Sequence, residues 1–308
     1  MPHTPIRLTL FILFLLASTA HAQLLDSATL IRDIRTLASP EFGGRRPGTE
    51  GHRKAVEYIV GRFASHKLDH YGSGYIDTFV FRNGEFGQNI IGYIPGHTNE
   101  AIVISGHYDH LGKRDGQLFL GADDNASGAA ALLSLSAYFA EHQPHYTLIF
   151  AAFDAEESGL QGARAFVENP PIPLKDIVLN VNMDMISRND NNELYAAGAF
   201  HSPHLLRWLD IPNEQVVLRT GHDDPALGSR DDWTYQSDHA VFHRLGIPFV
   251  YFGVEDHPDY HTPNDTFENI QPAFYYNAVR IILQFIKNAD TAGMLSEREP
   301  TRRELLMR

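Results

Sequence analysis

The stretch from Ala101 to Phe153 constrains the fold more than any other part of the sequence. The apolar run at 101–105 predicts a buried strand, the apolar pattern at 127–141 predicts a helix, and the apolar run at 147–153 predicts a second strand. A strand, a helix and a strand in this order form a βαβ unit, whose two strands lie parallel in one sheet.

Strands and helices continue to alternate along the rest of the chain. This alternation predicts an α/β fold with a mostly parallel, doubly wound sheet. Asn83-Gly84 forms a turn between the first two strands, which indicates an antiparallel edge and hence a mixed sheet. The further strands are predicted at 75–81, 89–94, 177–182 and 248–252. The first helix is predicted from a cap at Asp26 or Ser27 through Leu37, and the second from a cap at Thr49 through Phe63. Further helices are predicted near 160–168, 237–245 and 271–287.

Residues 1–22 have the order of a secretory signal peptide. Arg7 precedes an apolar run at 8–16, and Ala20-His21-Ala22 has the small-x-small form of a cleavage site. The alternative is a transmembrane anchor, but the apolar run is too short to cross a bilayer. We therefore expect an exported protein that is periplasmic or extracellular.

The composition excludes several classes of partner and site. The chain of 308 residues has no cysteine, so disulfides and thiolate metal sites are excluded. Its net charge is −13, and loss of Arg7 with the signal leaves 24 − 38 = −14, which makes nucleic acid and anionic membranes poor partners. No other stretch is apolar enough for a stable membrane anchor after signal removal. The mature chain is predicted to comprise one domain at 23–290 and a charged tail at 291–308.

Groups that can bind a metal ion follow the predicted strands. Ligand sites of open α/β sheets form at this end of the strands, and a dication such as zinc binds imidazole nitrogen and carboxylate oxygen there. Two histidines and three carboxylates can hold two dications with one carboxylate bridging, which leaves an adjacent carboxylate as a general base. The patches are Gly106-His107-Tyr108-Asp109-His110, Asp123-Asp124, Asp154-Ala155-Glu156-Glu157, Asn182-Met183-Asp184 and Asp259-Tyr260-His261, with Ser237-Asp238-His239 at a helix start.

Each patch also has a structural interpretation. A single aspartate after a strand is usually a helix cap or turn former, and Glu156-Glu157 alone resembles a solvated acidic pair. Asp123 is expected to play a structural role because its side chain should point away from that of Asp124. Ser237-Asp238-His239 is expected to cap its helix and brace the site, because consecutive residues cannot form a catalytic triad. The chain also lacks the Gly-x-Ser-x-Gly motif of serine hydrolases.

With these residue types in this order, the sequence resembles the co-catalytic di-zinc aminopeptidase family, whose relatives include glutamate carboxypeptidase and glutaminyl cyclase. The resemblance covers nearly the whole mature chain. It implies a three-layer α/β/α sandwich around a mixed sheet and a cis peptide bond at Asp124–Asn125. The stretches that carry it are Ser39–Gly51, Gly106–Gly112, Gly121–Gly128, Phe153–Gly162, Asn182–Ile186, Ser237–Phe242, Gly246–Pro248 and Tyr260–Thr266.

The same resemblance implies a role for each site residue. Glu156 would be the general base, and Asp109 would orient a metal-binding imidazole. Tyr260 is a candidate hydrogen-bond donor to the oxyanion, although packing beside a ligand would equally explain it. The implied ligands of two zinc ions are His107 and Asp184 for one ion, Glu157 and His261 for the other, and Asp124 for both.

We therefore expect a zinc-dependent aminopeptidase that hydrolyses the N-terminal peptide bond of peptide or aminoacyl substrates, using a metal-bridged water. A glutaminyl cyclase-like acyltransferase on the same fold is one alternative, and a carboxypeptidase or amidohydrolase with the same metal centre is another. A non-enzymatic ectodomain is disfavoured, because no ligand is lost. Residues 200–236 match no motif and are expected to build part of the substrate wall.

Overall fold

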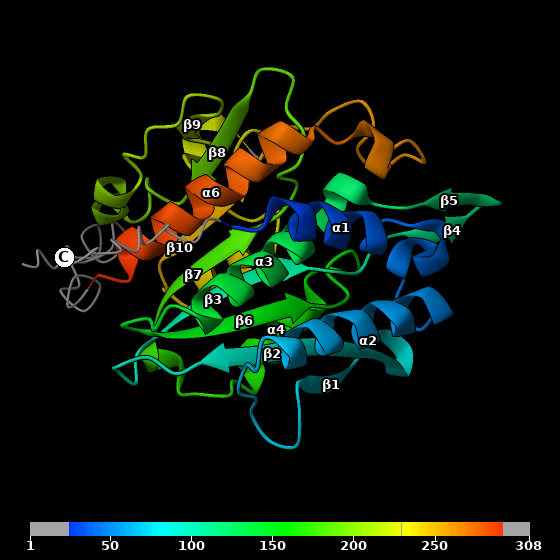
Figure 1. Cartoon of the computed structure of the whole chain (residues 1–308), viewed down its shortest axis with the longest axis horizontal. Helices are drawn as coiled ribbons and strands as arrows, with labels where there is room; N and C mark the ends of the chain where they lie inside the picture. Colours follow the sequence, from blue (N-terminus) through cyan, green and yellow to red (C-terminus); the bar gives the residue numbers. More distant parts are fainter. Residues whose placement is uncertain (1–24, 229, 292–308) are drawn as a thin grey trace, which may run out of the picture.

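The computed structural model describes residues 25–228 and 230–291 (Figure 1). The predicted signal peptide lies outside the described residues, as does the predicted tail apart from residue 291, so both stay predictions. Among the helices of the described part, none is both long and apolar enough to cross a membrane.

An eight-stranded sheet with the strand order β1-β2-β6-β3-β7-β10-β8-β9 runs through the centre. Strands β6, β3, β7 and β10 are parallel to one another, β2 is antiparallel to β6 and to β1, and β8 is antiparallel to β10. The predicted mixed, mostly parallel sheet is thus confirmed. The strands are β1 Ile76–Phe81, β2 Glu85–Ile94, β3 Ala101–His107, β6 Thr147–Phe153, β7 Ile177–Met183, β8 Glu193–Ala197, β9 Val217–Thr220 and β10 Phe249–Gly253, with a separate hairpin of β4 Gly112–Arg114 and β5 Gln117–Phe119.

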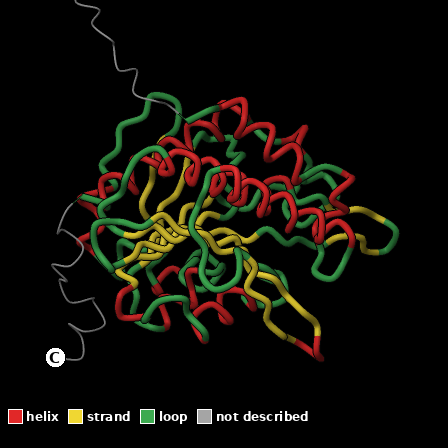
Figure 2. The backbone as a smooth tube through the Cα atoms, turned by 60° about the horizontal axis from the view of Figure 1, so that its bottom comes forward, coloured by secondary structure: helices red, strands yellow, loops and turns green. Residues whose placement is uncertain are grey.

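Helices cover both faces of the sheet, as Figure 2 shows with the strands between two helical layers. Alternate residues of β3 pack on opposite sides: Ile102 and Ile104 belong to one apolar core, and Val103 belongs to the other. The first core includes α1 Ser27–Leu37, α2 Glu50–Ser65, α3 Gly128–Ala140 and α6 Pro272–Ala289, and the second includes α4 Gln161–Glu168 and α5 His239–Arg244. This arrangement is the three-layer sandwich that the resemblance implies.

The capping residues explain where the first helices begin. The Asp26 carboxylate accepts hydrogen bonds from the first-turn amides of α1, and the Thr49 hydroxyl accepts one from the His52 amide of α2. Shorter turns occupy Pro40–Arg45, Arg82–Gly84, Ala122–Ser127, Leu174–Asp176, Pro203–Trp208, Pro225–Leu227 and Phe267–Asn269.

The sequence does not predict β4, β5, β8 or β9. Residues 193–197 contain no valine, isoleucine or threonine, and form a strand because β10 offers them a buried edge for antiparallel pairing. Most residues of β9 are exposed, so this strand lacks the apolar signature as well. Strand β2 begins four residues earlier than predicted, because Glu85 to Gln88 pair with β1 across the turn.

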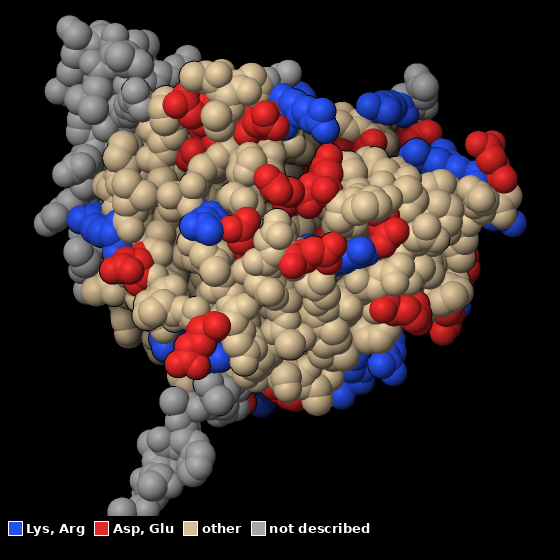
Figure 3. Space-filling model, turned by 90° about the horizontal axis from the view of Figure 1, so that it is seen from above, with Lys and Arg blue, Asp and Glu red and all other residues tan. Residues whose placement is uncertain are grey.

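Charged side chains are interspersed over the surface. On the face that Figure 3 shows from above, acidic groups lie between uncharged residues, and several stand beside basic groups. The surface ion pairs include Lys54 with Glu41 and Arg219 with Glu193. The prediction that nucleic acid is a poor partner stays a prediction.

Candidate metal centre

The predicted metal ligands meet at the carboxyl ends of the central parallel strands. His107 is the last residue of β3, Asp184 directly follows β7, and Glu157 lies four residues after β6. Asp124 lies in the turn before α3, and His261 lies in the loop between β10 and α6. Segments far apart in the sequence therefore converge at the edge of the sheet where the sequence places the site.

The ligands form two clusters that share Asp124. In the first cluster, His107 Nε2 lies 3.3 Å from Asp124 Oδ1 and 3.3 Å from Asp184 Oδ1. In the second, His261 Nε2 lies 3.0 Å from Asp124 Oδ2 and 3.4 Å from Glu157 Oε2. Asp124 thus turns one carboxylate oxygen toward each cluster, which is the disposition of a bridging ligand. The peptide bond between Asp124 and Asn125 is cis, as the resemblance implies.

The donors of both clusters fit a zinc-like dication. Nitrogen and oxygen ligands at 2.0–2.2 Å from a tetrahedral ion lie about 3.3–3.5 Å from one another. The nitrogen–oxygen separations within the clusters are 3.0–3.4 Å. In addition, the buried oxygen Oε1 of Glu157 has no hydrogen-bond partner among the described residues. Separation, donor type and an unsatisfied oxygen therefore agree with two cation positions.

The electrostatics of the clusters favour positive charge. Burial alone would lower the pKa of His107, but the carboxylates led by Asp184 raise it well above the ordinary value. Burial also opposes protonation of His261, yet its contacts with Asp124 and Glu157 raise its pKa to about 10. Burial would raise the pKa of Asp124, but both histidines bring it well below the ordinary range. The site therefore gathers protons on imidazoles when no cation is bound.

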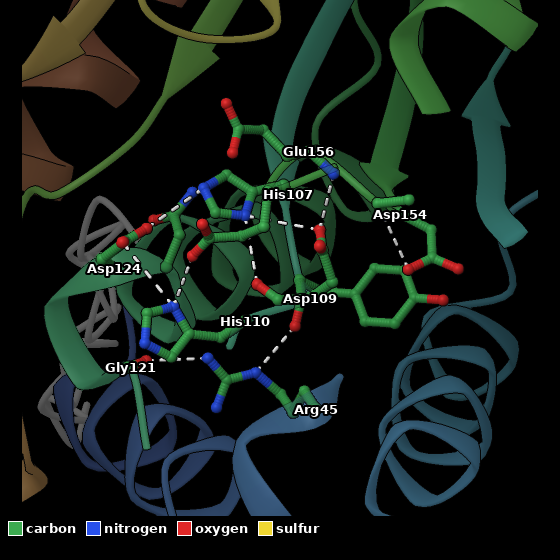
Figure 4. A network of polar contacts seen from close by, with 12 residues as sticks. Arg45, His107, Asp109, His110, Gly121, Asp124, Asp154 and Glu156 are labelled. Carbon is green, nitrogen blue, oxygen red and sulfur yellow. Dashed lines mark hydrogen bonds and ion pairs between the residues drawn. The ribbon is translucent and has the colours of Figure 1, made fainter. Parts of the chain in front are cut away.

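Glu156 stands apart from the two clusters. Its carboxylate points away from the dashed network in Figure 4, and it lines the pocket that opens onto the clusters. Burial raises its pKa well above the ordinary value, and the opposing effect of His107 does not cancel this rise. Because Ala155 has a φ of 54° and the Gly159 and Leu160 amides bond the Glu156 carbonyl oxygen, Glu156 and Glu157 lie in a turn rather than an extended segment.

Asp109 contacts His107 mainly through its main chain. The Asp109 carbonyl oxygen lies 3.2 Å from His107 Nδ1, whereas its carboxylate Oδ1 is 3.6 Å away. The same Oδ1 accepts a hydrogen bond of 3.0 Å from the Glu156 amide. Asp109 is thus placed to orient the imidazole, and it also fixes the backbone of Glu156.

Neighbouring polar residues brace the ligands. Asp123 points away from the clusters, as expected, and accepts two hydrogen bonds of 2.7 Å from Ser187. The Ser237 hydroxyl donates to Asp184 Oδ2 at 2.7 Å. The expected helix cap is absent, however, because Asp238 makes no capping bond and neither of its buried carboxylate oxygens has a partner in the described part of the chain.

Arg45 is a buried residue to which the sequence assigns no role. Its guanidinium donates 2.7 Å hydrogen bonds to the carbonyl oxygens of Leu37, Tyr108, Leu120 and Gly121. Figure 4 shows it below His110, joined to Gly121 by a dashed line. Arg45 therefore ties the loop after β3 to the segment before Asp124. An arginine in a loop is usually exposed, so the sequence gives little sign of this role.

His110 is a second residue that the sequence analysis leaves without a role. It is buried, and its Nδ1 lies 2.8 Å from Glu157 Oε1 and 3.6 Å from Asp124 Oδ2. It therefore faces the second cluster. Its position three residues after His107 is the only signal in the sequence, because β3 ends at His107 and strand alternation no longer gives a direction.

The clusters open into a pocket with an aromatic wall. Tyr260 lines this pocket and also stacks on the His261 ring, with 4.0 Å between the ring centroids. Its location therefore fits both a donor that faces the pocket and a side chain that packs on a metal ligand. Trp233 and Gln236 bring part of residues 200–236 to the wall, as expected, and Trp233 is held by stacking on His222 at 3.8 Å. The described lining residues are Asp124, Glu156, Glu157, Asp184, Met185, Trp233, Gln236, Tyr251, Val254, Asp256, Tyr260 and His261.

Sequence comparison gives one family and several partial relatives. The sequence model of peptidase family M28 matches residues 89–286. Leupeptin-inactivating enzyme 1 of Streptomyces exfoliatus is 30% identical over 225 residues, which are 71% of this chain and 46% of that protein. A vacuolar membrane protease of Candida glabrata is 28% identical over 185 residues, 59% of this chain and 18% of that protein. The chain thus spans less than half the length of these two relatives.

Solved structures share the fold. An aminopeptidase from Aneurinibacillus sp. strain AM-1 superposes with a TM-score of 0.69 at 18% identity, covering 86% of this chain and 94% of that one. A glutaminyl cyclase from Bacteroides thetaiotaomicron gives 0.68 at 19% identity, with 86% and 99% covered. A zinc aminopeptidase from Bacillus subtilis gives 0.67 at 17% identity, with 86% and 95% covered.

Proposed function

The chain belongs to peptidase family M28, and on this premise we propose that it is a zinc-dependent aminopeptidase that removes residues from free N-termini. One observation carries the proposal: Asp124 turns one oxygen to each of two imidazole–carboxylate clusters, and Glu156 lines the same pocket without belonging to either. A shared carboxylate between two cation positions, beside a free carboxylate, suits hydrolysis assisted by two metal ions and a general base.

The ligand set follows the two clusters. His107 and Asp184 would hold one zinc ion, Glu157 and His261 the other, and Asp124 both. When bound, the two ions would polarise the scissile carbonyl group and lower the pKa of the attacking water. The zinc aminopeptidase among the solved structures with this fold supports the choice of metal.

Glu156 is the general base in this proposal. It would take a proton from the attacking water and return it to the leaving amine, so the carboxyl group must change its protonation state during each turnover. Burial raises its pKa, which brings the group closer to the pH at which both directions of transfer are accessible. The hydrogen bond from its amide to Asp109 fixes the backbone from which the side chain reaches the pocket.

Tyr260 would stabilise the negative charge that develops on the carbonyl oxygen. Burial and the neighbouring carboxylate of Asp124 raise the pKa of its hydroxyl. The hydroxyl therefore keeps its proton at neutral pH and can donate it in a hydrogen bond.

The charge of the pocket supports a free N-terminus as the bound group. Asp184, Glu156 and Asp256 are among the lining residues, whereas the described lining includes no lysine or arginine that could pair with a C-terminal carboxylate. Arg230 lines a neighbouring pocket together with Asp231. An acidic pocket attracts an ammonium group and repels a carboxylate.

Paired substrates test the proposal. Zinc-loaded protein is expected to cleave leucyl-p-nitroanilide and to refuse the N-acetylated form, because acetylation removes the amine. Efficient cleavage of the acetylated substrate, or release of residues from the C-terminus only, would overturn the exopeptidase assignment. Peptides with N-terminal glutamine are assayed in parallel, since release of ammonia without peptide-bond cleavage identifies a glutaminyl cyclase.

We also propose that the protein is exported and that its mature chain starts at or near Gln23. The support is the order of Arg7, the apolar run at 8–16 and Ala20-His21-Ala22. Intact-mass analysis of protein collected outside the cytoplasm checks this proposal. Retention of residues 1–22 would contradict it.

A further inference from the structure

We infer that His110 is a further protein ligand of the second metal position, beside Asp124, Glu157 and His261. The inference rests on the metal-binding part of the proposed function and assigns a ligand beyond the five that the resemblance implies. It makes the two metal positions unequal, with three protein ligands at the first and four at the second.

The environment of His110 requires a partner that the described residues do not provide. The residue is 1% exposed, and neither ring nitrogen has a hydrogen-bond partner among them. Glu157 Oε1 is equally buried and unsatisfied, although it lies only 2.8 Å from His110 Nδ1. This separation is shorter than the roughly 3.3–3.5 Å of two ligands on one tetrahedral ion, so a bound cation would draw the two atoms slightly apart; what points to a cation is that both atoms are buried and neither makes a hydrogen bond within the described part of the chain. A buried cation between them satisfies both.

The same nitrogen also faces the bridging carboxylate. His110 Nδ1 lies 3.6 Å from Asp124 Oδ2, the oxygen that His261 Nε2 approaches to 3.0 Å. The two imidazole rings are 6.0 Å apart between centroids and inclined by 54°, so they approach the cluster from different sides. His110 Nδ1, Asp124 and Glu157 offer ligand atoms that all lie within 4.8 Å of one another.

The backbone on the other side of the ring shows that His110 is held in place. Gly121 has a φ of 58°, and a Cβ atom there would lie 2.4 Å from His110 Cγ and 2.1 Å from the Asp124 carbonyl oxygen. Only glycine lets the ring lie against this segment. Arg45 in turn holds the Gly121 carbonyl oxygen, and Figure 4 shows the His110 ring between Gly121 and Asp124.

Four protein ligands change what the second position can do. A tetrahedral zinc site with three protein ligands keeps an open position for substrate or water, whereas four protein ligands close it. The second ion would therefore be held more tightly, and it would act on the substrate by expanding to a fifth ligand, as catalytic zinc sites can. The first position, with His107, Asp184 and Asp124, keeps the open coordination site and exchanges its metal more readily.

X-ray absorption of the wild-type protein loaded with one zinc equivalent tests the inference directly. We expect two imidazoles on that ion, from His110 and His261, and three imidazoles shared by two ions at two equivalents. One imidazole at one equivalent, or two imidazoles shared by two ions, would overturn the assignment. These measurements need no variant and no substrate.

His110→Ala provides the second test, with zinc affinity measured by competition against a chelator. We expect the tighter affinity to fall by more than the roughly 10–100-fold that loss of an outer-shell partner causes. His239→Gln is the matched control, because His239 is also fully buried but bonds the Trp233 carbonyl oxygen instead of a ligand. If His110→Ala binds both ions as tightly as this control, the inference is wrong.

The two tests separate this inference from the proposed function. A protein that shows two imidazoles at one zinc equivalent but cleaves no aminoacyl substrate keeps His110 as a ligand and loses the aminopeptidase assignment. An active aminopeptidase with one imidazole per ion keeps the aminopeptidase assignment and loses His110 as a ligand. If His110→Ala does not fold, the absorption data on the wild type decide.

Discussion

Replacing Arg45 with methionine tests whether one buried cation holds the metal loops together. The substitution keeps an apolar stem of similar length and removes the guanidinium group. In the wild type this group satisfies four carbonyl oxygens at 2.7 Å, those of Leu37, Tyr108, Leu120 and Gly121. The variant removes this donor from all four oxygens; that of Gly121 keeps a hydrogen bond of 3.1 Å from the Ala126 amide, whereas the others lose the guanidinium partner, and buried unsatisfied groups are costly.

The expected loss follows from two opposing contributions. Hydrogen bonds to charged groups contribute about 1.5–3 kcal/mol each, so four would give about 6–12 kcal/mol before costs. Burial of the guanidinium offsets part of this gain, and its cost is visible in the pKa of Arg45, which burial lowers to about 10. A buried acceptor left without its partner costs about 1–3 kcal/mol. Because the relief of guanidinium burial offsets part of the sum over these oxygens, we expect a net loss of about 3–5 kcal/mol.

Urea unfolding of metal-free protein measures the change, with Arg53→Met as the control. Arg53 is exposed and pairs with Glu50 and Glu57 on the surface of α2, so its loss should change stability far less. Arg45→Lys should recover only part of the loss, because lysine keeps the charge but lacks the planar five-donor fork. If Arg45→Met unfolds within about 1 kcal/mol of the wild type, the four carbonyl oxygens have other partners and the reasoning fails.

Three further substitutions separate chemistry from scaffold. Glu156→Gln should lower turnover by a factor of roughly 10²–10⁴ while bound zinc, measured by elemental analysis, stays at the wild-type level. Loss of zinc in Glu156→Gln but not in Glu157→Gln would show that the roles of general base and metal ligand are reversed between the two glutamates. Asp124→Ala should lose both ions and the thermal stabilisation by zinc, and a wild type that binds a single ion would contradict the bridge. Asp238→Asn tests a carboxyl whose pKa burial raises to about 8. Because the unfolded pKa is near 3.9, the folded wild type loses stability as pH rises from about 4 to about 8. The stability of chelator-treated Asp238→Asn relative to wild type should therefore grow across this window, and a constant difference in urea unfolding would refute it.

Long apolar strands followed directly by polar residues made the site predictable. Strand β3 is buried along its whole length and ends at His107, while β7 is almost fully buried and precedes Asp184, so the strand boundary and the ligand coincide. The carboxyl ends of parallel strands share one edge of a sheet, which brings such ligands together whatever the loops do. His261 could be assigned only from the resemblance, because seven residues separate it from the end of β10.

The remaining features depend on contacts distant in sequence. The direction of His110 is set by Gly121 on another segment, and the partners of Arg45 range from Leu37 to Gly121. Ala155, Met185 and His261 all have positive φ values, which non-glycine residues rarely adopt. None of the three is a glycine or an asparagine, so the local sequence carries no sign of these conformations. Surrounding structure holds them there, as is common beside functional sites.

The charges around the metal centre link zinc binding to folding. Arg45 is the buried cation behind the clusters, but its donors are occupied by carbonyl oxygens. The carboxylates of Asp124, Asp184 and Glu157 therefore depend for neutralisation on protons held by His107 and His261 or on bound cations. A ligand that binds only the folded state stabilises it by about 4.1 kcal/mol at 1,000 times its dissociation constant. Because the unfolded chain cannot assemble ligands from five separate segments, zinc should stabilise the fold by an amount of this size at each position, independently of any effect on catalysis.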